Sequence, residues 1–247
     1  MAALWSPGDG FARPVAAVHG FAAAARNLGV TIRTGTRVVG IDTSAGGEAV
    51  VRTADGAGYA TPTVVCTAGA WSRAIGAMVG VDLPIEPVRR QIAFTPPLHP
   101  SPPSVPFTIG YSTTAYFHAD EDGGLLMGWA DPTQAVGFDR SITTDWHGSL
   151  REALSTFAPR VAELPISHGW AGLYEMTPDC NALIGEVDVG FRFLYAAGFS
   201  GHGFLQGPAV GECVADLCLG RPPAVDVSRF DVRRFHCRVA RTELGII

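Results

Sequence analysis

The chain has 247 residues, of which 47% are hydrophobic and 17% are charged, so it can bury a sizeable core and is not a disordered segment. Its formal net charge of -5 gives no reason to expect nucleic acid or an anionic membrane as a partner. No apolar run reaches the roughly 18 residues of a transmembrane helix, and residues 1–10 lack the pattern of a signal peptide, so we expect a soluble, cytoplasmic protein without a membrane span.

The first third of the chain alternates helix and strand patterns. Apolar residues repeat at helical spacing over residues 13–29, with a proline in the first turn and Gly29 as a left-handed cap. Apolar and polar residues then alternate over 30–41, and short strand patterns follow at 49–53 and 63–67. This order predicts an α/β layer.

Prolines and strand patterns replace this alternation from Asp82 onward. Strand patterns lie at 88–95, 113–118 and 125–129, with a proline-rich loop at 96–106 and a glycine-ending turn at 120–124. An amphipathic helix follows, with its apolar face formed by Trp146, Leu150, Leu154 and Phe157, and Pro159 is expected to end it. We expect an α+β insert with an antiparallel sheet here.

The last third returns to an α/β pattern. A short apolar strand at 193–197 leads into a glycine-rich turn, and a helix at 204–219 follows. The fold class is therefore predicted as α/β plus α+β. We expect a discontinuous α/β domain made of residues 1–81 and 173–247, interrupted by an insert at 82–172.

The glycine-rich turn is the most informative segment, and it reads Gly198-Phe199-Ser200-Gly201-His202-Gly203. Its three glycines allow a sharp turn and a close approach of the backbone to a ligand. The helix that follows would direct free N–H groups toward an anion, a phosphate or a carbonyl. Such turns also exist for packing alone, so ligand binding and packing both stand at this point. The spacing is not that of the dinucleotide fingerprint, which occurs nowhere in the chain.

Cysteines and arginines carry weaker signals. The cysteines form no pair at metal-binding spacing, so they predict reduced thiols and no metal site; they are Cys66, Cys180, Cys213, Cys218 and Cys237. A basic cluster near the C-terminus is more often a solvated tail than a binding patch; it consists of Arg233, Arg234, Arg238 and Arg241.

The turn and four further segments, taken together, resemble the D-amino-acid-oxidase-like superfamily of FAD-dependent oxidoreductases. The segments agree with that superfamily in order and spacing; they are 8–14, 36–38, 64–72, 174–185 and 198–211. The resemblance implies an FAD-dependent dehydrogenase or oxidase that acts on a secondary amine or an amino acid by hydride transfer to the flavin. It also implies an incomplete FAD-binding α/β layer with an inserted substrate domain that contains an antiparallel sheet.

The same resemblance implies a set of cofactor-binding residues. Val38 would lie beside the adenine, and the N–H groups of Gly201, His202 and Gly203 would face the N1–C2=O edge of the flavin, where negative charge develops on reduction. The full set expected near the cofactor is Val38, Ala68, Gly69, Trp71, Gly172, Gly198, Ser200, Gly201, His202, Gly203 and Phe204. For Trp71 a buried core position is the alternative.

The chain departs from the sarcosine-oxidase pattern at three positions. Gly172 stands where those enzymes attach the flavin to a cysteine, so a flavin here would be non-covalent. Leu126 and Leu205 replace two lysines, which are linked there to oxygen activation and to the substrate carboxylate. Neither oxygen as acceptor nor a sarcosine-like carboxylate clamp is therefore implied.

Four residues are the candidates for the catalytic side: His202, Arg89, Tyr116 and Tyr174. An arginine suits a substrate carboxylate, and strand alternation directs either Arg89 or its neighbour Arg90 inward; a surface salt bridge is the alternative for each. Tyr116 and Tyr174 are candidate pocket walls, with ordinary packing as the alternative. For His202 we expect a role at the flavin edge rather than as a general base.

In the superfamily a βαβ unit with the dinucleotide fingerprint precedes the segments found here. The resemblance therefore implies that this chain lacks the pyrophosphate site and holds FAD weakly or not at all. The alternative to an active enzyme is a non-catalytic fragment, or a subunit that completes its flavin site only with a missing N-terminal segment or a partner chain.

Overall fold

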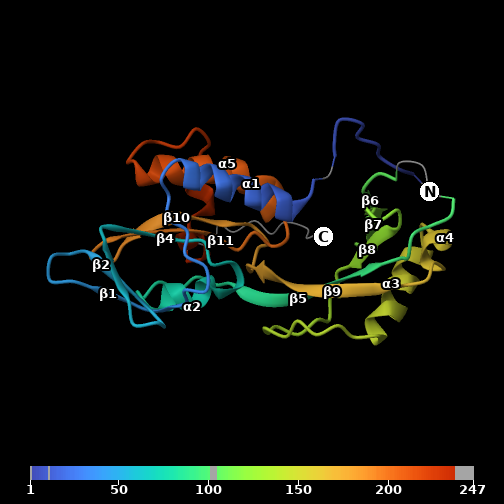
Figure 1. Ribbon diagram of the computed structural model, residues 1–247, viewed down its shortest axis with the longest axis horizontal. Helices are drawn as coiled ribbons and strands as arrows, with labels where there is room; N and C mark the ends of the chain where they lie inside the picture. Colours follow the sequence, from blue (N-terminus) through green and yellow to red (C-terminus); the bar gives the residue numbers. More distant parts are fainter. Residues whose placement is uncertain (1, 11, 101–104, 237–247) are drawn as a thin grey trace.

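The computed structural model describes residues 2–10, 12–100 and 105–236. The strands form three sheets, with the orders β1-β2-β3, β10-β11-β4 and β6-β7-β8-β5-β9. The first two sheets share one hydrophobic core, and the five-stranded sheet has a second core of its own. Figure 1 shows these two parts side by side, joined by the long strands β5 and β9.

The α/β part is built on a mixed sheet of three strands. Strand β11 (Arg192–Ala197) pairs in parallel with β4 (Thr63–Cys66) and antiparallel with β10 (Leu183–Asp188). All six positions of β11 except the first are buried, as its apolar sequence predicts. Helix α5 (Gly203–Cys218) follows β11 through the glycine-rich turn, so the predicted strand–turn–helix is confirmed.

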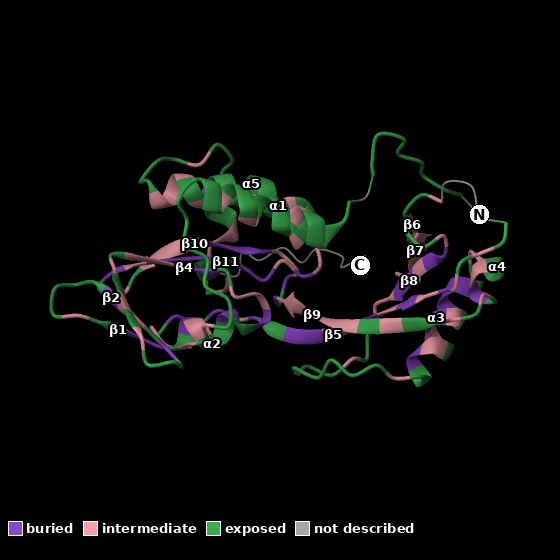
Figure 2. Cartoon of the chain, viewed as in Figure 1, coloured by how far each residue is buried: buried purple, intermediate pink, exposed green. Residues whose placement is uncertain are grey.

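Helix α1 (Pro14–Asn27) forms where the apolar periodicity predicts it, and Gly29 has the expected positive φ of 90°. None of its residues is buried, and Val15, Val18 and Phe21 are all more than 60% exposed. Figure 2 shows the helix exposed along its length, on the same side of the β10-β11-β4 sheet as α5. The large apolar side chains of this helix are thus exposed, while Ala22 and Ala25 are half-buried.

The strand predicted over 30–41 forms only at its end. Strand β1 spans Val38–Thr43, and 30–37 are not in a strand because no strand among the described residues pairs with them. β1 continues into an antiparallel sheet with β2 (Ala49–Thr53) and β3 (Gly58–Thr61), the last of which the sequence did not predict. A 3-10 turn, η1 (Gly69–Trp71), and the short helix α2 (Ser72–Ala77) follow β4.

The central part of the chain forms the predicted antiparallel sheet. Its strands are β5 (Glu86–Phe94), β6 (Thr108–Ile109), β7 (Tyr116–Ala119), β8 (Leu125–Trp129) and β9 (His168–Met176). All pairings are antiparallel, and the β7–β8 hairpin turns where the glycine-ending turn predicts it. Strand β9 was not predicted, and it runs through the boundary expected between residues 172 and 173.

Two helices cover one face of this sheet. Helix α3 (Asp145–Ser155) buries Trp146, Leu150 and Leu154 against Met127 and its neighbours, as its apolar face predicts. Pro159, expected to end this helix, instead occupies the first turn of α4 (Pro159–Ala162), where a proline needs no N–H. The proline-rich loop lies partly outside the described residues.

Two short 3-10 turns, η2 (Ser228–Phe230) and η3 (Val232–Phe235), end the described chain. The prediction of a solvated arginine tail is wrong for Arg234, which is buried and pairs with Asp179. Arg233 is exposed and pairs with Asp231. Arg238 and Arg241 lie outside the described residues, as does Cys237.

Candidate functional site

The glycine-rich turn has a backbone that only a few residue types adopt easily. The φ angles of Gly198, Ser200 and Gly201 are 73°, 52° and 105°, so three of four successive residues are in the left-handed region. Ser200 tolerates this because its hydroxyl lies inside, accepting from Thr177 N at 3.2 Å and donating to Gly198 O at 3.2 Å. The Ser200 hydroxyl therefore links the turn to Thr177 and also to the turn's own first residue, Gly198.

The N–H groups of the turn divide into two sets. Gly198 donates to the Glu175 carboxylate at 2.9 Å, and Ser200 to the Glu175 carbonyl at 3.2 Å. His202 donates to Phe199 O at 2.9 Å, so its N–H is not available for a cofactor, in contrast to the sequence-based expectation. Those of Gly201 and Gly203 have no acceptor among the described residues. These two free donors stand at the N-terminus of α5, where a partial positive charge favours an anion or a carbonyl.

A second turn lies beside the first. Strands β4 and β11 are parallel, with Cys66 opposite Tyr195, so the segments that follow them lie at the same edge of the sheet. Ala68 precedes η1, and Gly69 has a φ of 54°. A Cβ on Gly69 would lie 3.6 Å from Glu175 Oε2. The structure therefore brings the segment of Ala68 and Gly69 next to the glycine-rich turn. Their place beside a cofactor stays a prediction.

Trp71, Val38 and Phe204 have different surroundings. Trp71 is 50% exposed and its ring lies 5.5 Å from that of Phe138, so it is not a buried core residue. Val38 opens β1 in the other three-stranded sheet, at a bulge before Gly40, and packs on the α/β core. Phe204, in the first turn of α5, is 48% exposed.

The face of the five-stranded sheet that points away from α3 and α4, called here the open face, brings together an arginine and two tyrosines. Arg90 on β5 lies with its guanidinium 5.2 Å from the ring of Tyr174 on β9, and Tyr116 on β7 interacts with both. Burial lowers the pKa of Arg90 and raises the pKa of Tyr116 and of Tyr174. Both phenols therefore stay neutral at physiological pH and can donate hydrogen bonds.

Arg90 has spare hydrogen-bonding capacity. One of its terminal nitrogens donates to Arg89 O at 3.2 Å, while its buried Nε has no partner among the described residues. A buried guanidinium N–H left unpaired is costly, and a carboxylate satisfies it with a charge-assisted bond. Arg90 is thus the arginine that this face offers to an anionic ligand.

Arg89 points to the other face of the same strand, as alternation requires. Its Nε donates to Gln134 Oε1 at 3.1 Å, and its Nη1 donates to Asp139 Oδ2 at 3.0 Å and to Ser141 O at 2.8 Å. The side chain is only 13% exposed and holds the segment that follows β8. Its surroundings match the salt-bridge alternative rather than the carboxylate anchor.

Two glycines shape the open face. Gly128 lies opposite Tyr116 in the β7–β8 pair, and a Cβ there would overlap the Tyr116 ring. Gly172 lies opposite Arg90 in the β5–β9 pair, and a Cβ there would lie 3.1 Å from the Trp170 ring. Each glycine therefore allows an aromatic ring to lie flat over the sheet.

Glu175 is the site residue that sequence reasoning missed. It follows Tyr174 directly, so one residue contacts Arg90 and the next contacts Gly198. Burial raises the pKa of the Glu175 carboxyl, and the N–H groups of Gly198 and Phe199 offset part of this effect. Its only sequence signal was its place in the segment 174–185, between Tyr174 and the residues Thr177, Pro178 and Asp179, which are called here the Thr177–Asp179 motif.

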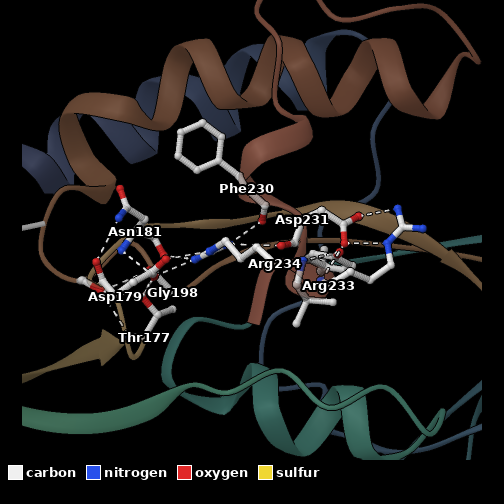
Figure 3. A network of polar contacts seen from close by, with 11 residues as sticks. Thr177, Asp179, Asn181, Gly198, Phe230, Asp231, Arg233 and Arg234 are labelled. Carbon is white, nitrogen blue, oxygen red and sulfur yellow. Dashed lines mark hydrogen bonds and ion pairs between the residues drawn. The ribbon is translucent and has the colours of Figure 1, made fainter. Parts of the chain in front are cut away.

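The Thr177–Asp179 motif forms a junction beneath the turn. Figure 3 shows Arg234 extending from η3 toward Asp179, with Asn181 and Gly198 close by. Arg234 donates to both carboxylate oxygens at 2.8 Å and to Asn181 O at 2.9 Å. Thr177 Oγ1 also donates to Asn181 O at 2.8 Å. The motif thus ties the C-terminal turns to the floor of the candidate site.

Other site types are less well supported by the described residues. Within residues 2–10, 12–100 and 105–236, no three side chains of the metal-binding types gather into a cluster. None of the helices in this part of the chain is both long and apolar enough to cross a bilayer. Four cysteines carry free thiols, as expected: Cys66, Cys180, Cys213 and Cys218.

Comparison with known proteins agrees with this geometry. The family model described as DAO, FAD dependent oxidoreductase, matches residues 1–217. The chain is 30% identical over 228 residues to glycine oxidase of Bacillus licheniformis, covering 87% of this chain and 56% of that protein. It is 32% identical over 197 residues to glycine oxidase of Pseudomonas aeruginosa, covering 79% and 49%. The chain thus spans about half the length of these curated relatives.

Solved structures give the same result. L-proline dehydrogenase from P. horikoshii superimposes with a TM-score of 0.83 at 30% identity, covering 93% of this chain and 61% of that one. Glycine oxidase from Geobacillus kaustophilus superimposes with a TM-score of 0.75 at 26% identity, covering 87% and 56%. Both likenesses include the two parts of the fold described above.

Proposed function

This chain belongs to the family of FAD-dependent oxidoreductases, and from that premise we propose that it supplies the substrate face and one flavin edge of an enzyme that oxidises a secondary amine or an amino acid. One observation carries the proposal. The neighbouring residues Tyr174 and Glu175 connect Arg90 to the glycine-rich turn. In the part of the chain that the structure describes, Arg90 has one N–H without an acceptor and the turn has two. An anionic substrate group and an electron-rich cofactor edge would thus be held on adjacent residues of one strand.

The residues present fit a non-covalent flavin at the turn. The N–H groups of Gly201 and Gly203 have no acceptor among the described residues, and Gly201 takes a left-handed backbone without a side chain that could block close approach. When bound, the flavin supplies a two-electron acceptor for the hydride of the substrate. The N–H groups would stabilise negative charge that develops at its N1–C2=O edge.

The substrate side acts through binding and orientation. Arg90 would hold a carboxylate, and the neutral phenols of Tyr116 and Tyr174 would donate to it or to the amine. An amine must be uncharged to release a hydride. The rings over Gly128 and Gly172 would exclude water from the face of the sheet. His202 caps α5 and has its N–H engaged, which favours a role in shaping the flavin edge over one as a base.

We further propose the domain division expected from the sequence, with residues 1–81 and 173–247 around the flavin and 82–172 around the substrate. The separate cores support this division. Free thiols at four cysteines favour the reducing cytoplasm.

A second candidate has its own support. Val15, Val18 and Phe21 of α1 are exposed apolar residues, as are Val30 and Ile32 beyond the helix, and a further segment or a partner chain would cover them. In that case this chain would be one component of the flavin site, and alone it would hold FAD weakly or not at all.

Flavin titration separates the two candidates. FAD is added to the purified chain, binding is followed by flavin fluorescence, and the bound flavin is exposed without oxygen to a panel of small amino acids and N-methyl amines. Bleaching of the visible flavin absorbance by a panel member supports an active enzyme. A chain that never retains FAD supports the component, and reduction by no amine in a flavin-loaded sample contradicts the proposed substrate class.

A further inference from the structure

Glu175 joins the three segments that meet at the candidate flavin edge. Its Oε2 accepts the Gly198 N–H at 2.9 Å, and its carbonyl oxygen accepts the Ser200 N–H at 3.2 Å. Gly69, from the neighbouring turn, has its missing Cβ position 3.6 Å from the same Oε2. One side chain of β9 therefore contacts both turns that follow the parallel strands β4 and β11.

This carboxylate stands in surroundings that do not favour its charge. Burial raises the pKa of Glu175, and what offsets the effect is the N–H groups of Gly198 and Phe199 rather than a lysine or an arginine. A partly buried carboxylate with no cation beside it among the described residues is not explained by stability alone. Asp179, only four residues on, has Arg234 as its cation. The contrast indicates that Glu175 serves to accept hydrogen bonds from backbone N–H groups rather than to form an ion pair.

The role follows from an account of the donors in the turn. The N–H groups of Gly198 and Phe199 face Glu175, and that of Ser200 is bonded to its main chain. The first half of the turn is therefore directed inward, toward β9. A chain held in this way must turn back at Gly201, whose φ is 105°, and it presents the N–H groups of Gly201 and Gly203 on the other side.

We propose that Glu175 is a positioning residue of the flavin site, a conclusion that rests on the proposed function. Its carboxylate fixes the first half of the glycine-rich turn, and this leaves the N–H groups of Gly201 and Gly203 free and correctly directed for the flavin edge. It does so without contact of its own with the reacting atoms.

Amide hydrogen exchange and FAD titration of the whole chain test the proposal together. In Glu175→Leu, exchange at Gly198 and Ser200 is expected to rise at least about tenfold, the effect of losing roughly one hydrogen bond. FAD affinity is expected to fall by a similar factor. Glu175→Gln keeps an oxygen acceptor for the Gly198 N–H, so it should restore both quantities to within about threefold of the unaltered chain.

Glu186→Gln is the matched control, because Glu186 lies on β10 and bonds Arg192 instead of the turn. It should change thermal stability without changing exchange at the turn or FAD affinity. If Glu175→Leu does not fold, Glu175→Asp gives the same test, since it keeps the charge and loses the reach.

The outcomes separate the two proposals. The exchange measurement needs no flavin, so unaltered exchange at Gly198 in the leucine or aspartate variant overturns the role of Glu175 whether or not the chain binds FAD. Faster exchange with unaltered FAD affinity overturns it as well. A parent chain that binds no FAD, with exchange responding as expected, counts against the proposed flavin site in this chain alone and leaves Glu175 as the residue that holds the turn.

Discussion

Arg234 and Asp179, which lie 55 positions apart in the sequence, form a buried, bidentate ion pair. Both bonds are 2.8 Å long, and the side chains are 7% and 3% exposed. The pair fixes η3 against the turn that precedes β10, close to Gly198 (Figure 3).

Removal of one partner of this pair should strongly destabilise the fold. Asp179→Asn leaves the guanidinium of Arg234 buried without its counter-charge, so we expect the free energy of unfolding in urea to fall by about 3–5 kcal/mol. The double variant Asp179→Leu with Arg234→Met should lose less than the two single losses combined, because no charge is left unpaired. Additive losses would show that the residues act independently.

The same pair should give the protein a particular sensitivity to acid. Burial raises the pKa of Asp179, but the bonds from Arg234 and from Asn181 N outweigh burial and hold it below the ordinary 3.8. The folded pKa is thus lower than the unfolded one. The stabilisation is complete above about pH 4 and is lost as the pH falls through the folded value. Between about pH 5 and 2, the free energy of unfolding should depend less on pH in Asp179→Asn than in the unaltered chain. An equal pH dependence in the two proteins would contradict the low pKa assigned to Asp179.

Arg90 should control the affinity for a carboxylate. Loss of a charge-assisted bond costs about 1.5–3 kcal/mol, so Arg90→Met in flavin-loaded protein should raise the dissociation constant of acetate by roughly 10- to 100-fold. Arg140→Met, at an exposed arginine elsewhere in the chain, should leave that constant unchanged. The perturbation of bound flavin absorbance measures both. An equal effect of the two variants would mean that Arg90 contributes only long-range charge.

Gly128 should matter through Tyr116. A Cβ at position 128 overlaps the Tyr116 ring, so Gly128→Ala must move that ring off the sheet. We expect acetate affinity to fall by about three- to tenfold while the overall fold is kept, since one hydrogen bond contributes about 1 kcal/mol. Gly148→Ala, on α3 where a Cβ meets nothing within 4 Å, is the control. An unchanged affinity in the first variant would remove Tyr116 from the site.

Gly203 should tune the flavin potential. A Cβ there would lie 3.2 Å from Phe199 Cβ, which forces the first turn of α5 to shift and tilts its free N–H. Reduced flavin loses more stabilisation than oxidised flavin, so the midpoint potential of Gly203→Ala should fall by roughly 10–30 mV at matched occupancy. Gly207→Ala, with open space around it, should not change the potential. A fall in cofactor content at constant potential would indicate a packing role alone.

Elements that depend on a local pattern of residues could be predicted from the sequence. Strands that form only because another strand pairs with them could not. Strand β8, the hairpin before it and the turn into α5 follow from apolar alternation and turn residues. Strand β9 has no such alternation and exists because it pairs with β5 over nine positions. Residues 30–37 show the reverse, since they alternate like a strand but have no strand beside them among the described residues.

The candidate site shows the same division. Alternation along β5 predicts that Arg89 and Arg90 point opposite ways, but which of them faces the site depends on where α3 packs. Arg234 was interpreted as a surface residue because its partner is distant in the sequence. Glu175 had no motif of its own, and only the folded turn shows what its carboxylate contacts.

The pairing of β5 with β9 has a consequence for how this architecture can vary. The chain leaves the α/β part on β5 and returns on β9, and these two strands are neighbours along their whole length, from Glu86 opposite Met176 to Phe94 opposite His168. Both junctions thus lie on one strand pair, so a loop between β5 and β9 that pairs with neither strand can change in length without moving either junction. The sheet beyond the junctions can therefore vary in its loops while the α/β part keeps its place on the chain.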